Sequence, residues 1–382
     1  MIRIVALALL VPVLPVMQAS AAAPPAPHPE AARTIVLATE ASPEGVAVAR
    51  HYMEVRGIPA ENFCLVSAPA TEEVTRDQFN AALWGPLRSF LQRWEGRLEV
   101  TLPDGELRLQ VTGRRPKYLV PVYGVPIKIK GYEDVKTMYL STAAAVDSEL
   151  ALLPAGTHKL PGWLGNPYFG ADAPFGPPLD EAMILVTRLD GPSAEVATHL
   201  VDDAVWAEAH GLKGKAYIDT RSIKDKGYIE GDQWLLNAAQ MLKGAGYDVT
   251  LDTKPEVFPL NFPMPDPAVY LGWYTENVAG PMAKPEFRFN RGAIAYHLQS
   301  FSGAAIRDTK THWVGPLLAR GACVTAGAVY EPFLGGTPHL DILMDRLLRG
   351  YSWGEACYMA EGVVSWQMCF IGDPLYRPFA KK

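Results

Sequence analysis

The feature that most constrains this fold is a repeated alternation of short apolar segments with longer segments of helical periodicity. Residues 34–38, apolar after Thr34, have the pattern of a buried strand, and Ser42-Pro43-Glu44 then supplies a helix N-cap followed by Pro at the first helical position. The same order recurs to the end of the chain. It predicts the α/β class, with a mostly parallel sheet flanked by helices on both faces.

The predicted elements fall into two groups, separated by residues 154–180, which are rich in Pro and Gly and have no periodicity. We interpret this stretch as a long surface loop or a linker between two subdomains, at residues 34–153 and 181–379. The first group has strands at 34–38, 63–66 and 117–123 and helices at 42–56, 75–94 and 141–153. The second has strands at 183–186, 215–219, 269–273, 293–298 and 322–326 and helices at 192–210, 232–245, 312–318 and 340–348.

The first 23 residues have the order of a secretory signal peptide. Arg3 precedes an apolar run from Ile4 to Met17, and small residues follow up to Ala23. The run has about 14 residues, fewer than the roughly 20 that cross a membrane. We therefore expect signal cleavage after Ala21 or Ala23 and a disordered lead over 24–33. The mature protein is expected to be periplasmic or extracellular, and soluble without membrane attachment.

Composition excludes some partners and leaves others open. The net charge of -6 provides no basic field for a phosphate backbone, so nucleic acid is not an expected partner. The four cysteines include no CxxC pair and have apolar neighbours, which favours buried thiols over a disulfide. No cofactor or metal motif is present, so none is predicted.

Polar and aromatic residues follow the predicted strands of the second group. In sheets of this kind, ligands bind beyond the carboxyl ends of the strands, so these residues predict a site at one sheet edge. Each also has a purely structural alternative, such as a helix cap or a buried ion pair. Asp147 and Glu149 join the candidates because interfaces between subdomains often bind ligands. The strand-end candidates for ligand binding are Arg188, Asp190, Asp219, Trp273, Tyr274 and Ser302, with Ser300 and Glu331 beside them.

From about residue 182 to 377, the order of motifs resembles the gingipain-like branch of the caspase-like cysteine peptidases. In that branch a strand ending in Gly-Arg-Leu precedes a long helix, as Thr187-Arg188-Leu189 does here. Later motifs correspond to Gly321-Ala322-Cys323-Val324 and to Gly372-Asp373-Pro374-Leu375-Tyr376-Arg377. The resemblance implies a caspase-like fold with a site at the ends of neighbouring strands.

Both positions of the catalytic dyad depart from that branch. Its histidine strand ends in Gly-His-Gly where this chain has Gly272-Trp273-Tyr274, and its cysteine position holds Ser300. An indole cannot activate a nucleophile as a base, so ordinary cysteine peptidase activity is not expected. His297 can serve as the base for Ser300 only if the strand breaks or bulges between them, because in a regular strand they face opposite sides.

Across most of the mature chain, phrases such as Val122-Tyr123-Gly124-Val125-Pro126 and Tyr330-Glu331-Pro332 resemble a family of exported bacterial proteins of undetermined activity. That family occurs in bacteria with exosortase systems, which accompany exopolysaccharide production, so the resemblance implies a setting rather than a reaction. The preferred hypothesis is binding of an exported peptide or polysaccharide-related ligand at the strand ends. The alternatives are a hydrolase rebuilt on Ser300, His297 and Glu331, or a structural or assembly factor of the exosortase and exopolysaccharide system.

Overall fold

The computed structural model describes residues 28–101, 107–111, 115–132, 140–158 and 160–379. The predicted signal peptide lies outside these residues. The lead is ordered from residue 28, in contrast to the disorder predicted there. Ala31–Arg33 form a 3-10 turn, with Ala31 buried, that leads directly into the first strand, and the Lys117 backbone N–H donates to the Arg33 carbonyl at 2.8 Å. Within the described ranges, no helix combines the length and apolarity needed to cross a membrane.

Two sets of parallel strands form the halves of the molecule. Each set has four strands whose side chains are mostly buried, which explains their near-continuous apolar sequences. The first set is ordered β10 (Leu185–Val186), β6 (Tyr118–Pro121), β1 (Thr34–Thr39) and β2 (Phe63–Val66). The second is ordered β12 (Val249–Asp252), β11 (Lys215–Asp219), β13 (Pro267–Trp273) and β14 (Ile294–Leu298).

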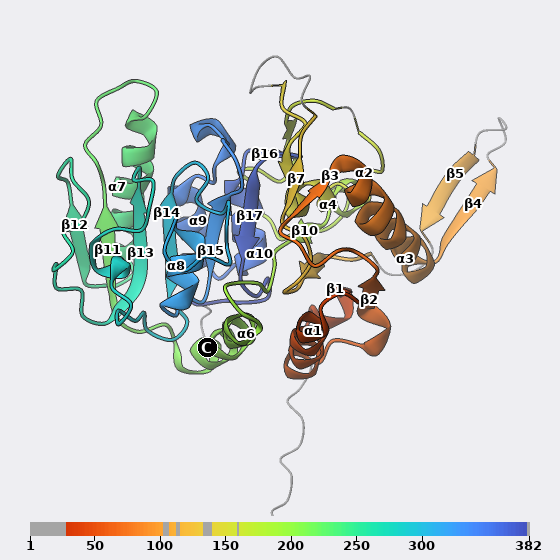
Figure 1. Ribbon diagram of the computed structural model, residues 1–382, viewed down its shortest axis with the longest axis horizontal. Helices are drawn as coiled ribbons and strands as arrows, with labels where there is room; N and C mark the ends of the chain where they lie inside the picture. Colours follow the sequence, from red (N-terminus) through yellow and green to blue (C-terminus); the bar gives the residue numbers. More distant parts are fainter. Residues whose placement is uncertain (1–27, 102–106, 112–114, 133–139, 159, 380–382) are drawn as a thin grey trace, which may run out of the picture.

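Two antiparallel strands, β15 (Thr325–Ala328) and β17 (Met368–Ile371), join the halves. On one side Val324 bridges to Ile294 of β14, and on the other Ile371 bridges to Arg188, just after β10. The strands therefore form one row across the molecule, as Figure 1 shows. Because β10 follows the Pro/Gly-rich stretch in sequence but pairs with β6, that stretch does not mark a break in the sheet.

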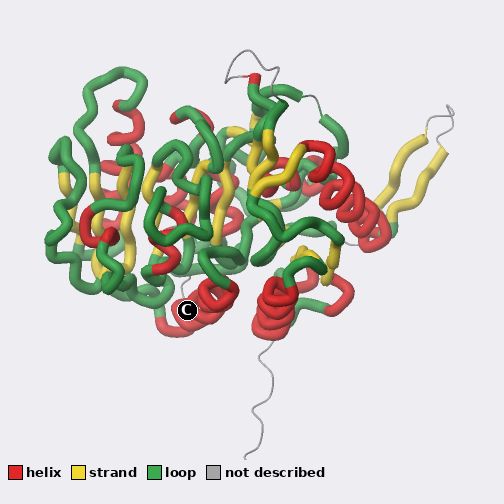
Figure 2. The backbone as a smooth tube through the Cα atoms, in the orientation of Figure 1, coloured by secondary structure: helices red, strands yellow, loops and turns green. Residues whose placement is uncertain are grey.

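Helices cover both faces of this row (Figure 2). In β1, Ile35 and Leu37 pack into one apolar cluster and Val36 and Ala38 into another, as the two-residue period of a strand requires. The first cluster includes side chains of α7 (Ile229–Gly244), α9 (Leu340–Leu348) and α10 (Trp353–Ala360). The second includes side chains of α1 (Pro43–Arg56), α6 (Ala194–His210) and α8 (Val314–Ala319). The predicted α/β class, with a mostly parallel sheet flanked by helices, is confirmed.

Smaller elements surround the core. The region predicted as a helix over 141–153 is mostly not helical, since it forms β8 (Ala144–Ala145) and the short α4 (Val146–Leu150). The remaining helices are α2 (Arg76–Phe79), a π-helical turn (Asn80–Trp84), α3 (Gly85–Glu95), α4 (Val146–Leu150) and α5 (Leu179–Ala182). The remaining strands are β3 (Glu73–Thr75), β4 (Arg97–Thr101), β5 (Leu107–Val111), β7 (Lys128–Lys130), β8 (Ala144–Ala145), β9 (Leu164–Gly165) and β16 (Val363–Val364).

The Pro/Gly-rich segment packs against α10. The Asn166 side-chain amide donates to the carbonyl oxygens of Tyr358 and Glu361, both at 2.7 Å. Tyr168 and Phe175 are buried in the same segment. From residue 160 onward it therefore forms an ordered segment that covers the end of this helix.

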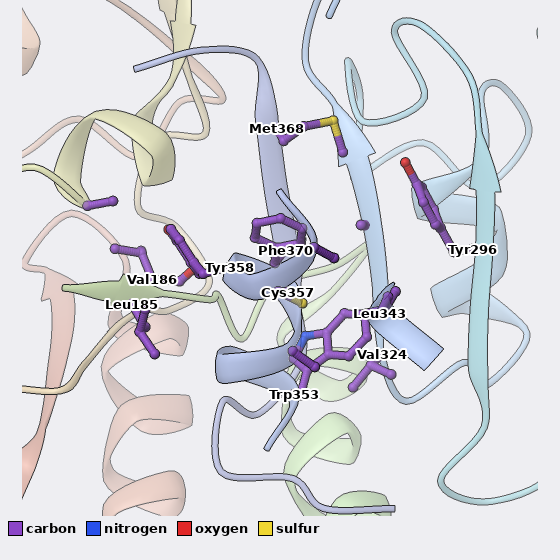
Figure 3. Close-up of a cluster of buried hydrophobic side chains, with 14 of the residues drawn as sticks. Leu185, Val186, Tyr296, Val324, Leu343, Trp353, Cys357, Tyr358, Met368 and Phe370 are labelled. Carbon is purple, nitrogen blue, oxygen red and sulfur yellow. The ribbon is translucent and has the colours of Figure 1, made fainter. Parts of the chain in front are cut away.

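Helix α10 occupies the junction between the two halves. Figure 3 shows Trp353, Cys357 and Tyr358 of this helix in one cluster with Val186 of β10 and Phe370 of β17. The thiol of Cys357 is buried, and burial raises its pKa. All four cysteines are buried and unpaired, which confirms the preference for buried thiols.

Candidate ligand-binding site

A cavity of about 510 Å³ lies beyond the carboxyl ends of β13 and β14 and beside the segment that follows β15. Its volume falls within the roughly 300–1,000 Å³ typical of small-molecule sites. Four of the sequence-predicted residues line it, namely Trp273, Tyr274, Ser300 and Glu331. The other lining residues are Gly227, Tyr228, Leu298, Gln299, Pro332, Phe333, Leu334, Gly335 and Thr337.

The first turn of α7 holds one wall of the cavity. The Trp273 indole N–H donates to Asp232 Oδ1 at 2.9 Å, and the side chain is buried. The same carboxylate accepts the backbone N–H groups of Arg221 at 2.8 Å and Ile223 at 2.7 Å. One carboxylate thus connects the indole to the loop that leads to Tyr228.

Three aromatic residues beyond neighbouring strand ends have left-handed backbone conformations. The φ angles are 68° at Tyr274, 59° at Phe301 and 56° at Phe333. Such angles are uncommon for bulky residues, and they cluster at functional sites when the surrounding structure enforces them. Here the enforcing contacts are hydrogen bonds from each backbone N–H, to Leu298 O at 3.0 Å, Tyr330 O at 3.0 Å and Glu331 Oε1 at 2.9 Å respectively.

Negative groups surround the Tyr274 hydroxyl. Its pKa is raised to about 12, first by a hydrogen bond with Tyr228, then by partial burial and by the nearby carboxylates of Glu331 and Asp225. The two tyrosine rings are 4.8 Å apart at their centroids. The Tyr274 phenol is therefore a neutral hydrogen-bonding group at neutral pH.

His297 lies beneath the cavity and is fully buried. Its Nε2 accepts the Thr275 backbone N–H at 3.2 Å, so the neutral ring carries its proton on Nδ1, which lies 2.9 Å from Tyr270 Oη. The ring stacks on Trp313 with centroids 3.5 Å apart. Burial lowers the pKa of His297 well below its usual value, which keeps the ring neutral.

His297 and Ser300 are not joined in the part of the chain that the structure describes. β14 has no register shift and ends at Leu298, so the strand breaks off before Ser300, but no hydrogen bond joins the two side chains there. Both imidazole nitrogens have other partners. Ser300 lines the cavity beside Glu331, whose Oε1 accepts the Phe333 N–H.

Arg188, Asp190 and Asp147 lie in the interior instead of lining the cavity. Arg188 Nε and Nη2 each donate to Asp147 at 2.9 Å, and Nη1 donates to Asp190 at 2.8 Å. All three side chains are buried. Their charges are neutralised within the protein, so they form an internal ion-pair network.

The remaining predicted ligand-binding residues are also held by internal contacts. Glu149 pairs with Arg76 at 3.0 Å and with His158 at 3.2 Å. Ser302 Oγ accepts the Ala328 backbone N–H at 3.1 Å, and Asp219 Oδ2 accepts that of Phe258 at 3.0 Å. Burial raises the pKa of Asp219 to about 7. None of these three lines the cavity.

Tyr228, Phe333 and Thr337 line the cavity but were not among the sequence candidates. Phe333 stands two residues after Glu331. A search that included more residues after each predicted strand would therefore find it. Tyr228 precedes a helix, and no local pattern links it to the strand ends. Over the described ranges, no group of three His, Cys, Asp or Glu side chains is placed to hold a metal ion.

Comparisons with known proteins give a distant likeness of overall fold. No family model matches the chain, and a search of curated proteins finds no significant match. A solved complex of the pro- and mature domains of RgpB from Porphyromonas gingivalis aligns over 90% of this chain and 79% of that one, with 11% identity and a TM-score of 0.48. A structure described as a protease aligns over 92% and 79%, with 13% identity and a TM-score of 0.49. At these values the likeness carries no information about activity.

Proposed function

We propose that this protein binds a peptide or polysaccharide-related ligand in the cavity at the strand ends and does not act as a cysteine peptidase. The observation that carries the proposal is the cavity lined by Tyr228, Tyr274 and Phe333 next to Ser300 and Glu331. Aromatic faces with a few fixed polar groups are typical of sites that bind such ligands. Holding two of these aromatics in left-handed backbone conformations has an energetic cost, which supports a functional role.

We also propose that the chain is an exported protein of caspase-like, gingipain-like architecture that has lost the catalytic dyad. Trp273 and Ser300 stand where that branch has histidine and cysteine, and both line the cavity. The Cys323 thiol does not replace the missing nucleophile, because it does not line the cavity, is buried, and has its pKa raised by burial. Binding without thiol chemistry is the function that these residues support best.

The hydrolase alternative has less support. It needs a base for Ser300, and both nitrogens of His297 already have partners. A fluorophosphonate probe distinguishes the two hypotheses. We expect no labelling of Ser300, whereas labelling that disappears in Ser300→Ala would overturn the binding-only proposal.

The binding itself is tested on an array of oligosaccharides and peptides. We compare the wild type with Tyr274→Asn, since asparagine tolerates the left-handed backbone of residue 274. At least one class of probe should bind the wild type and lose about tenfold in affinity in the variant. Tyr132→Asn is the control, because Tyr132 is an exposed aromatic that does not line the cavity. An array with no binding, or equal binding by both proteins, would contradict the proposal.

A further inference from the structure

The cavity has one carboxylate and no basic side chain. Among its thirteen lining residues, Glu331 is the sole charged one. Glu331 Oε1 accepts the Phe333 N–H, and within the described part of the chain Oε2 accepts no hydrogen bond. The half-buried carboxylate therefore has an oxygen available to a ligand.

Among the described residues, no basic side chain lines the cavity beside this carboxylate. The guanidinium of Arg221 donates to the backbone oxygens of Pro255 and Tyr274 and to Thr275 Oγ1. Lys224 and Lys226 are exposed and do not line the cavity. Asp225 and Glu331 both raise the pKa of Tyr274, so its hydroxyl lies in the field of two carboxylates. A cationic group on the ligand would complement it.

The aromatic side chains add to the same preference. Tyr228 and Tyr274 are tilted at 58° to each other with centroids 4.8 Å apart, and Phe333 lines the cavity with them. Aromatic faces attract cations through their negative quadrupole. Together with Glu331, they form a site for an ammonium group.

Among the described strands, the sheet offers no free edge to an extended peptide at this place. A peptide that adds to a sheet needs an unpaired edge. β13 pairs with both β11 and β14, and β14 is bridged to Val324 on its other side. Gln299, Ser300 and Thr337 instead supply side-chain hydrogen-bonding groups beside the rings, which suits a ring that carries hydroxyl groups.

We propose that the ligand is an amino-sugar oligomer whose free ammonium group pairs with Glu331 while its sugar rings stack on Tyr274 and Phe333. This assignment rests on the proposed function, because it names the ligand class of the same cavity. An N-acetyl group would remove the positive charge and place an uncharged amide against the carboxylate. The structure thus assigns a preference for the free amine over the acetylated sugar.

The test is calorimetric titration with glucosamine tetramer and with N-acetylglucosamine tetramer. The wild type should bind the free amine at least about tenfold more tightly. Glu331→Gln retains an oxygen to accept the Phe333 N–H but removes the charge, and it should abolish that difference. Glu276→Gln removes an exposed carboxylate that follows Tyr274 in the chain but does not line the cavity, and it should bind as the wild type does.

Each other outcome overturns a defined part of the assignment. Equal binding of the two tetramers would refute the ammonium preference and leave the binding function intact. Tighter, Glu331-dependent binding of tetralysine would replace the sugar with a basic peptide. No binding of either tetramer would refute the amino-sugar assignment, and the array described above would then decide independently whether the cavity binds any ligand.

Discussion

Asp219 ends β11 with a carboxyl group that is only half satisfied. Oδ2 accepts the Phe258 N–H at 3.0 Å, whereas Oδ1 is buried without a hydrogen-bond partner among the described residues. Burial, together with the nearby charge of Asp252, raises the pKa to about 7 from an ordinary 3.8. The folded state therefore favours the protonated form. The stability that protonation of Asp219 contributes is fully present below the unfolded pKa, and it is lost as pH rises through the folded pKa of about 7.

Asp219→Asn should remove this pH dependence, because the amide oxygen can still accept the Phe258 N–H while the charge is gone. We expect the variant to match the wild type near pH 4 and to be more stable at pH 8, by up to about 4 kcal/mol. Urea unfolding across this pH range measures the difference. Glu286→Gln, at an exposed position, controls for the general loss of a carboxylate. Parallel stability curves for Asp219→Asn and the wild type would contradict the prediction.

At the residue scale, the choice of polar and aromatic residues that follow each predicted strand finds candidate site residues. It does not separate ligand-binding groups from structural ones. It directs attention to Trp273 and Ser300, which line the cavity. It selects Arg188 equally, but this residue is neutralised by Asp147, which lies 41 positions earlier in the chain. Burial and pairing depend on such distant contacts, so local sequence patterns cannot reveal them.

Among the elements, α7 holds the cavity wall through a close contact at Gly231. A Cβ there would lie 2.3 Å from the Trp273 ring. Gly231→Ala should therefore displace the indole from Asp232 and destabilise the fold by about 1–3 kcal/mol, with weaker ligand binding. Gly244→Ala in the same helix meets no atom within 4 Å and should be neutral or stabilising by up to about 1 kcal/mol. Thermal unfolding and tryptophan fluorescence compare the two. Equal stability of both variants would show that the contact relaxes freely.

The elements also show which sequence patterns are informative. β11 and α9 lie at the residues predicted, because one is a short apolar run and the other has a clear apolar stripe. Helix α10 was not predicted, since all eight of its residues are buried and no polar face gives it a period. β17 was missed because it is a short strand at the junction, and only its antiparallel pairing with β15 defines it.

At the scale of the whole molecule, both halves depend on one junction. The Arg188 backbone N–H donates to Phe370 O at 2.9 Å, and its carbonyl accepts the Gly372 N–H at 2.9 Å. Its buried side chain also donates to the carbonyl oxygens of Val125 and Pro126. The residue therefore connects β17 to the segment after β6. Because the sheet is continuous there, we expect the halves to unfold together.

Arg188→Met tests this coupling, because it leaves Asp147 buried without its cation and weakens the neutralisation of Asp190, which retains Arg307. Breaking a buried ion pair in this way should lower the free energy of unfolding by about 3–5 kcal/mol. Asp147→Asn added to Arg188→Met should recover part of the loss, since it removes the unpaired charge. Native-state hydrogen exchange measures the protection of backbone amides in β1 and in β13 separately. The protection of both strands should fall by the same amount. A loss confined to β1 would show that the halves are independent units, despite the continuous row of strands.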